Sequence, residues 1–270
     1  MSLQYVNKAG ICEDLCNMVC RYYSSNKANI DSTAAKFYSG NDFCLKYKSD
    51  LMRLAVVIKA FEYTHKDYVA KGIPDDIFFD TLSDVGIWCE ENYNKGLKNY
   101  HWLKNHVRFS LFKLGRLQFQ FYPCVNFTLN YSELPFSFGD NLLFIHIPRA
   151  GKLDYEKCRE SLEFARRFFS NYFPEFKYEY FFCESWLLFG DNNRFMSESS
   201  NILRFSDLFE YGYSNNNESQ AFDRIFGVSK PLCSKSKISA LPNNTSLQKN
   251  AIEYKLAGGK FGQGVCWIKK

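Results

Sequence analysis

Apolar positions in the first part of the chain recur every three to four residues, the period of a helix that buries one face. Residues 49–74 show this period, with Ser49 or Asp50 suited to begin the helix and a glycine, then a proline, to end it. Further helices are predicted over residues 74–96 and 99–114. The pattern therefore predicts a helical first half.

The period changes to two at Gly115. Apolar and polar residues alternate over residues 117–121, which is typical of a half-buried strand, with Gln118 and Gln120 opposite the apolar side. Strands are also predicted over residues 141–148 and 177–190, helices over 155–173 and 244–259, and a short helix, a strand and a polar loop over 200–217.

The strand at residues 141–148 is apolar throughout, so we expect it to be central in the sheet. A strand, a helix and a strand in succession indicate a parallel crossover connection. The chain is thus predicted to be α+β, with a helical domain at residues 1–120 and a mixed domain at 121–270.

Composition narrows the class of protein. The 270 residues can form a sizeable core, and an aromatic share of 18% indicates broad packed apolar surfaces or a deep pocket. The net charge is +5, but basic and acidic residues are interspersed, which argues against a nucleic-acid partner. No apolar run approaches the roughly 18 residues of a membrane span, and the first residues carry no export signal. We expect a cytoplasmic protein with no membrane partner.

Metal binding is not expected. Cys12, Cys16 and Cys20 are four residues apart and share one helix face, a spacing that suits a core-facing stripe better than a cluster site. The four histidines lack the pairing of zinc ligands. The ten cysteines are expected to be reduced thiols.

Polar residues interrupt two of the predicted strands. His146 lies in the apolar strand and needs a hydrogen-bond partner or a cavity. In the next strand, Glu184 faces the side opposite Cys183 and Ser185. Glu184 is suited to act as a general base if burial raises its pKa, or it is a carboxylate paired at a strand edge. A nucleophilic pair of Cys183 and His146 is a further alternative.

The loop after the first of these strands has two interpretations. Arg149, Gly151 and Lys152 precede a helix and have the character of a phosphate-binding loop. Asp154 and Glu156 in the first helical turn would repel an anion there. From the residues alone, the loop either binds phosphate or only turns the chain.

Several segments resemble, in order, a bacterial family of GNAT-like acyltransferases. They are GIPDDIFFDTLSDVGIW, LGRLQFQF, FIHIPRAGKLD, SLEFARRFFSNYFPE, FFCESWLLFG, SSNILRF and LPNNTSLQKNAIEYKLAGG. Members have a helical N-acyltransferase N-terminal domain followed by a GNAT-like C-terminal domain. The resemblance runs from about residue 72 to residue 259, and implies a GNAT-like mixed sheet with flanking helices after residue 120.

The resemblance implies that the strand through His146 and the following helix bind acyl-CoA, either acetyl-CoA or another thioester. The loop residues expected to hold it are Ile147, Arg149, Ala150, Gly151 and Lys152. The loop departs from the Q/R-x2-G-x-G/A pattern of the wider superfamily.

The implied activity is transfer of an acyl group, most simply acetyl, to an amine of a small molecule or peptide. Glu184 or His146 would be the base and Ser185 or a tyrosine the acid. The expected substrate-binding residues are Cys183, Trp186, Ser200 and Asn201. The alternative is a degenerate GNAT fold that binds a small ligand or a protein without catalysis. A cysteine hydrolase is the third reading, and the oligomeric state is not predicted.

Overall fold

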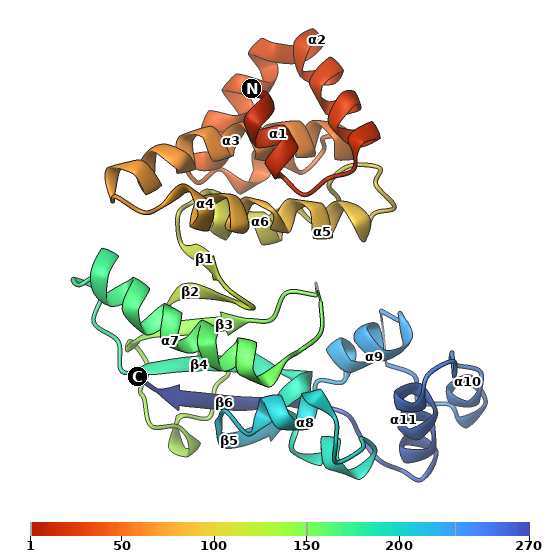
Figure 1. Cartoon of the computed structure of the whole chain (residues 1–270). Coiled ribbons are helices and arrows are strands. Elements are labelled where there is room, and N and C mark those ends of the chain that lie inside the picture. Colours follow the sequence, from red (N-terminus) through yellow and green to blue (C-terminus); the bar gives the residue numbers. More distant parts are fainter. Residues whose placement is uncertain (1, 150, 230) are drawn as a thin grey trace. The chain divides into compact units, whose positions relative to one another are not determined.

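The computed structural model describes residues 2–149, 151–229 and 231–270 (Figure 1). Its contacts divide the chain into two compact units. The first unit comprises Met1–Phe121, His146–Gly151 and Ser161–Glu175, and the second comprises Tyr122–Ile145, Lys152–Glu160 and Phe176–Lys270.

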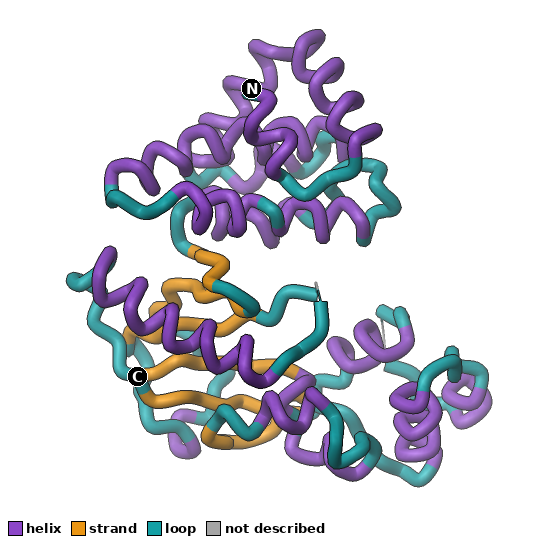
Figure 2. The backbone as a smooth tube through the Cα atoms, viewed as in Figure 1, coloured by secondary structure: helices purple, strands orange, loops and turns teal. Residues whose placement is uncertain are grey.

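The described residues before Leu111 form helices, turns and loops (Figure 2). The helices are α1 (Leu3–Lys8), α2 (Glu13–Tyr38), the 3-10 helix η1 (Asp42–Leu45), α3 (Asp50–Ala70), α4 (Asp75–Leu82), α5 (Asp84–Glu90) and α6 (Tyr100–Val107). Ser49 caps α3, because its Oγ accepts a hydrogen bond from the Met52 backbone N–H at 3.2 Å. The predicted helical N-terminal region is confirmed.

Two helix predictions require correction. The stretch 74–96 forms two helices, α4 and α5, with a turn at Ser83 between them. The Ser83 hydroxyl donates to the Asp80 carbonyl at 2.6 Å, a local bond that competes with helix continuation. In α5, a Cβ at Gly86 would come within 2.1 Å of the Gly10 carbonyl oxygen, so this close backbone approach requires glycine.

The predicted helix over residues 99–114 ends at Val107, and its last residues form strand β1 (Leu111–Leu114). This strand pairs antiparallel with β2 (Leu117–Pro123), and Leu114 lies opposite Leu117. The two-residue turn between them contains Gly115 at a φ of 73°. The short run Leu-Phe-Lys-Leu suits either element, so its periodicity alone could not assign it.

The predicted strand from Gly115 onward is confirmed as β2, but its polar side differs from the expectation of a half-buried strand. Leu117 and Phe119 are fully buried, and Gln118 between them is only 1% exposed. Both faces of this part of β2 are therefore covered.

Six strands form one mixed sheet in the order β1-β2-β3-β4-β6-β5, where β3 is Asn141–His146, β4 is Tyr180–Ser185, β5 is Glu210–Asn215 and β6 is Gln263–Lys269. The predicted central position of β3 and its parallel pairing with β4 are confirmed, with α7 (Tyr155–Tyr172) as the crossover helix. Strand β6, which the sequence did not predict, pairs antiparallel with both β4 and β5.

Short helices complete the second unit: η2 (Tyr131–Glu133), η3 (Trp186–Leu188), η4 (Gly190–Arg194), α8 (Asn201–Ser206), α9 (Ser219–Phe226), α10 (Lys235–Ser239) and α11 (Ser246–Leu256). A capping box of Thr245 and Gln248 begins α11. Trp186, Phe222 and Phe261 belong to one apolar cluster there.

Much of the aromatic content lies in the core. In the first unit, the rings of Phe112 and Phe121 on the hairpin contact those of Phe169 and Phe173 on and after α7, with centroid separations of 5.0–5.8 Å. These contacts support the packed-surface interpretation of the aromatic share.

Candidate active site

His146 is the last residue of β3 and follows a mostly buried apolar strand. Its Nε2 atom lies 2.8 Å from Oε1 of Gln120 on β2. An amide oxygen can only accept a hydrogen bond, so Nε2 carries the proton and Nδ1 is the basic nitrogen.

The electrostatic surroundings keep this ring neutral. Burial lowers the pKa of His146 to about 3, and repulsion from His106 acts in the same direction, while Asp84 acts against it. At neutral pH the imidazole is therefore in the form that accepts a proton.

A buried polar cluster, which we call the Asp84 network, comprises Asp84, Trp88, Trp102, His106 and Gln118. The indole N–H groups of Trp88 and Trp102 donate to Asp84 Oδ2 at 3.1 and 2.9 Å. Gln118 donates to Asp84 Oδ1 at 2.8 Å, and His106 Nε2 lies 3.2 Å from Oδ2. Asp84 is 2% exposed and His106 is fully buried.

The Asp84 carboxylate stays ionised inside this network. Burial alone raises the pKa of Asp84, but the hydrogen bond and charge of His106, with the bonds from the two indoles, outweigh burial and lower the pKa to about 2.

Sequence reasoning missed the Asp84 network, although a signal was present. Asp84 and Trp88 are four residues apart, as are Trp102 and His106, so each pair shares one face of a helix. Only the fold shows that Gln118, from a strand, meets these faces.

The predicted phosphate loop lies between β3 and α7. Ile147 is partly buried, Arg149, Gly151 and Lys152 are exposed, and Ala150 lies outside the described residues. Arg149 forms an ion pair with Glu91 at 3.0 Å. Gly151 has a φ of 74°, a conformation that favours glycine.

Arg116, which the sequence analysis did not single out, contacts this loop. Its guanidinium donates to the carbonyls of Pro148 at 3.0 Å and Gly151 at 3.4 Å. Its backbone N–H donates to the hydroxyl of the buried Ser161 at 2.7 Å.

The start of α7 is capped by its own side chains. Asp154 Oδ1 accepts a hydrogen bond from the Lys157 N–H at 2.9 Å, and Glu156 pairs with Arg159 at 3.0 Å. This helix end already carries negative charge, so anion binding would depend on the basic side chains of the loop.

Strand β4 of the second unit carries three further candidates. Glu184 Oε1 accepts a hydrogen bond from the amide of Asn215 at 2.7 Å. Burial raises the pKa of Glu184, and the bond from Asn215 opposes this only in part. Cys183 and Ser185 are buried and Glu184 is partly exposed, which agrees with the predicted alternation.

Cys183 is buried in the core, and the hydroxyl of Ser185 is hydrogen-bonded to the backbone. Cys183 is 1% exposed, and burial raises the pKa of its thiol well above the ordinary value, which argues against a thiolate nucleophile. The Ser185 hydroxyl accepts a hydrogen bond from the Leu187 N–H at 3.2 Å and caps η3.

The other predicted substrate-binding residues lie further along the second unit. Trp186 is 8% exposed within an apolar cluster, and its backbone N–H donates to the Gln220 side-chain oxygen at 2.8 Å. The Ser200 hydroxyl accepts from the Ile202 N–H at 3.2 Å and caps α8, and Asn201 is the exposed first residue of that helix.

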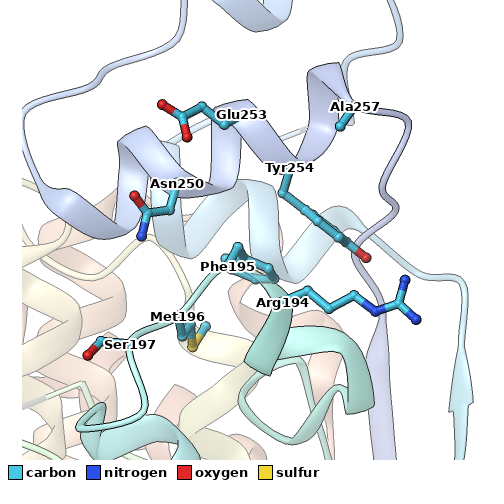
Figure 3. A pocket seen from close by; sticks show the side chains of 8 residues that line it. All are labelled: Arg194, Phe195, Met196, Ser197, Asn250, Glu253, Tyr254 and Ala257. Carbon is cyan, nitrogen blue, oxygen red and sulfur yellow. The ribbon is translucent and has the colours of Figure 1, made fainter.

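The second unit has a pocket of about 540 Å³, and Figure 3 shows the side chains that line it. It is lined by Arg194, Phe195, Met196, Ser197, Asn250, Glu253, Tyr254 and Ala257. The rings of Phe195 and Tyr254 stack with centroids 5.0 Å apart. The sequence did not predict this cavity, because its lining comes from α11 and from η4 with the residues after it, more than fifty residues apart.

Neither a metal cluster nor a membrane span is found in the part of the chain that the structure describes. No group of three His, Cys, Asp or Glu side chains there could hold a metal ion, and none of its helices could span a membrane. The predicted core position of the cysteine stripe is wrong at Cys12, which is exposed because it precedes the first turn of α2; Cys16 and Cys20 are partly buried.

Comparison with known proteins covers nearly the whole chain. A family model described as "N-acyltransferase N-terminal domain" matches residues 4–109, and one described as "GNAT-like C-terminal domain" matches residues 111–268. No curated protein matches the sequence.

Solved structures of acyltransferases share the fold. An acyltransferase in complex with decanoyl-CoA and teicoplanin matches with a TM-score of 0.77 at 20% identity, over 98% of this chain and 86% of that one. An acyltransferase in complex with CoA and 10C-Teicoplanin gives the same values. An acyltransferase mutant in complex with octanoyl-CoA gives a TM-score of 0.76 at the same identity and coverage. At this identity the likeness shows the fold.

These findings confirm the α+β prediction, with its helical N-terminal region and GNAT-like mixed sheet, and the resemblance stated from the sequence. The C-terminal match alone spans more than half of the chain. The chain therefore belongs to the family of proteins with a GNAT-like C-terminal domain, preceded by an N-acyltransferase N-terminal domain.

Proposed function

We propose that this protein is an N-acyltransferase that moves an acyl group from acyl-CoA to an amine of a small molecule or peptide. The observation that carries the proposal is the succession of the two family domains along the chain, at residues 4–109 and 111–268. The acyl-CoA complexes of the acyltransferases with the same fold support it.

The reaction needs an attacking amine, a base and an acid. The amine nitrogen attacks the thioester carbonyl, and the tetrahedral adduct then loses the CoA thiolate as the C–S bond breaks. The base takes one proton from the amine nitrogen, and the thiolate gains one from the acid. The products are an amide and free CoA.

His146 is the base that we favour. Its Nε2–H donates to Gln120, so Nδ1 is the basic ring nitrogen, and the ring is neutral at neutral pH. With this low pKa it is a weak base, so the proton it accepts is that of the positively charged nitrogen of the adduct, which is far more acidic than the free amine. Glu184 is the competing base, because its raised pKa makes it the stronger proton acceptor. Ser185 is the proposed acid.

Two variants separate the candidate bases. We expect His146→Gln to lower kcat by roughly 10²- to 10⁴-fold, the usual contribution of a general base, and Glu184→Gln to lower it much less. The kcat of each variant is measured from the release of free CoA thiol, which is followed with a chromogenic disulfide. The opposite order of effects would transfer the role to Glu184, and unchanged rates in both variants would exclude both residues.

The loop after β3 is the proposed site for the phosphates of CoA. Arg149 and Lys152 are exposed and can turn toward an anion, and Gly151 allows close approach of the backbone. The ion pair of Arg149 with Glu91 is mostly solvent-exposed on the arginine side, so exchanging it for a phosphate costs little.

The acyl chain length is a separate question. The donor expected from the resemblance is acetyl-CoA or another acyl-CoA, whereas the solved structures of the same fold hold decanoyl-CoA and octanoyl-CoA. Initial rates with acetyl-, octanoyl- and decanoyl-CoA at equal concentration, with a panel of amines, decide between short and medium chains.

The second candidate is a fold that binds a ligand without catalysis. The acidic start of α7, where Asp154 caps the helix, favours it, because this helix end attracts anions less than an uncharged one would. Saturable CoA binding without thiol release for any donor and amine pair would support this candidate over the enzyme.

A further inference from the structure

The Asp84 network keeps a carboxylate in the interior of the first unit. A buried charge is costly unless hydrogen bonds satisfy it, and Asp84 has partners on three elements: Trp88 on its own helix, Trp102 and His106 on α6, and Gln118 on β2. Among the described residues, His106 Nδ1 has no hydrogen-bond partner although it is buried. An apolar core would avoid these costs, so the arrangement needs a reason beyond packing.

Two members of the network link it structurally to His146, Trp102 by a ring contact and Gln118 through the strand that it shares with Gln120. The Trp102 indole donates to Asp84, and its ring meets the His146 imidazole edge-to-face, with centroids 4.8 Å apart and planes at 88°. Gln118, which donates to Asp84, is two residues from Gln120, and Gln120 holds His146. Residues two apart on a strand share a face, so both glutamines belong to one polar face of β2.

The imidazole therefore has two contacts that the network supports. Trp102 fixes its plane, and Gln120 fixes which ring nitrogen carries the proton. Asp84 accepts a hydrogen bond from the Trp102 indole. It accepts another from Gln118, which lies on the same face of β2 as Gln120. Trp88 donates to the same oxygen of Asp84 as Trp102 does, and its ring lies against that of Trp102, with centroids 5.9 Å apart.

We propose that Asp84 is a positioning residue that orients His146 through Trp102 and Gln118. The inference rests on the proposed function of His146 as the base, and goes beyond it by assigning a role to residues that do not touch the reacting atoms. A shift of about 1 Å in a base can cost roughly 100-fold in rate, so fixing this ring has a measurable consequence.

The two tryptophans provide a matched comparison. Trp102→Phe and Trp88→Phe each remove one indole N–H bond to Asp84 Oδ2. We expect similar losses of thermal stability in both variants. Trp102→Phe also changes the ring that meets His146, so it should lower kcat by roughly tenfold and more than Trp88→Phe does, with KM for acyl-CoA within about twofold of the wild-type value. Asp84→Asn should lower kcat further, because its amide cannot accept all of the donors.

NMR of the histidine ring gives a readout that does not depend on turnover. In the wild type, long-range ¹H–¹⁵N spectra should show a single tautomer of His146 with the proton on Nε2, and ring-current shifts from Trp102. Trp102→Phe and Asp84→Asn should move or broaden these resonances, and Trp88→Phe should change them less.

The outcomes are distinguishable. Equal effects of the two tryptophan variants on kcat, or an unchanged His146 spectrum in Trp102→Phe and Asp84→Asn, would overturn the positioning role and leave the network as part of the core. If His146→Gln proves fully active, the proposed base fails, while the NMR comparison still decides whether Asp84 orients the ring.

Discussion

At the scale of single residues, His146 combines a fixed tautomer with a neutral charge. The hydrogen bond to Gln120 determines the tautomer, and burial together with repulsion from His106 keeps the ring neutral. A histidine in an apolar strand could be anticipated from the sequence as either a satisfied core residue or a functional one. Its partner Gln120 could not, because the alternation along β2 indicates only on which side of the strand a residue lies.

The lowered pKa of His146 predicts that the free energy of unfolding falls as the pH is lowered. Since the folded-state pKa is about 3 and the ordinary value is 6.5, the unfolded chain binds a proton at this residue between those values and the folded chain does not. This contribution to stability is complete above pH 6.5 and is lost as the pH falls. Between pH 7.5 and pH 5 we expect the wild type to lose about 1 to 2 kcal/mol more than His146→Gln in the free energy of unfolding.

Denaturant unfolding at the two pH values measures this difference. His101→Gln, at an exposed position of α6, controls for the loss of a histidine and should lose as much stability as the wild type. Equal losses in the wild type and in His146→Gln would contradict the neutral state of this partly buried ring.

At the scale of helices and strands, the sequence pattern predicted those elements that depend on residues close together in the chain. The Ser49 cap of α3, the apolar run of β3 and the helix after it all follow from neighbouring residues. Strands β1 and β6 were missed, because a four-residue run has no decisive period and β6 is defined by its antiparallel partners β4 and β5. The break between α4 and α5 lies at Ser83, whose hydroxyl donates to the Asp80 carbonyl, and the close approach of Gly86 in α5 to Gly10 is a tertiary contact that no local pattern contains.

The start of α7 yields a prediction with two opposite effects. Asp154→Ala removes the cap on the Lys157 N–H and should lower the free energy of unfolding by about 1 kcal/mol. The same change removes a negative charge next to the loop, so CoA should bind more tightly. Thermal unfolding and calorimetric titration measure the two effects. Weaker CoA binding in a folded Asp154→Ala variant would show that the phosphates do not lie at this helix end.

At the scale of the whole molecule, the two family matches account for nearly all of the chain, and the fold is that of solved acyltransferases. The resemblance could be found from short segments of sequence because they carry family-specific residues. For the Asp84 network the sequence contains only the two pairs of residues four apart on helices, because tertiary structure alone brings two helices and a strand to one carboxylate.

The central claim is that acyl-CoA binds at the loop after β3. Calorimetric titration of the wild type and of the double variant Arg149→Glu, Lys152→Glu with acetyl-CoA, octanoyl-CoA and free CoA tests it most directly. We predict saturable binding of at least one thioester and of CoA to the wild type, and its loss in a variant that unfolds at the wild-type temperature. Absence of binding to folded wild-type protein, or equal binding by the variant, would contradict the claim.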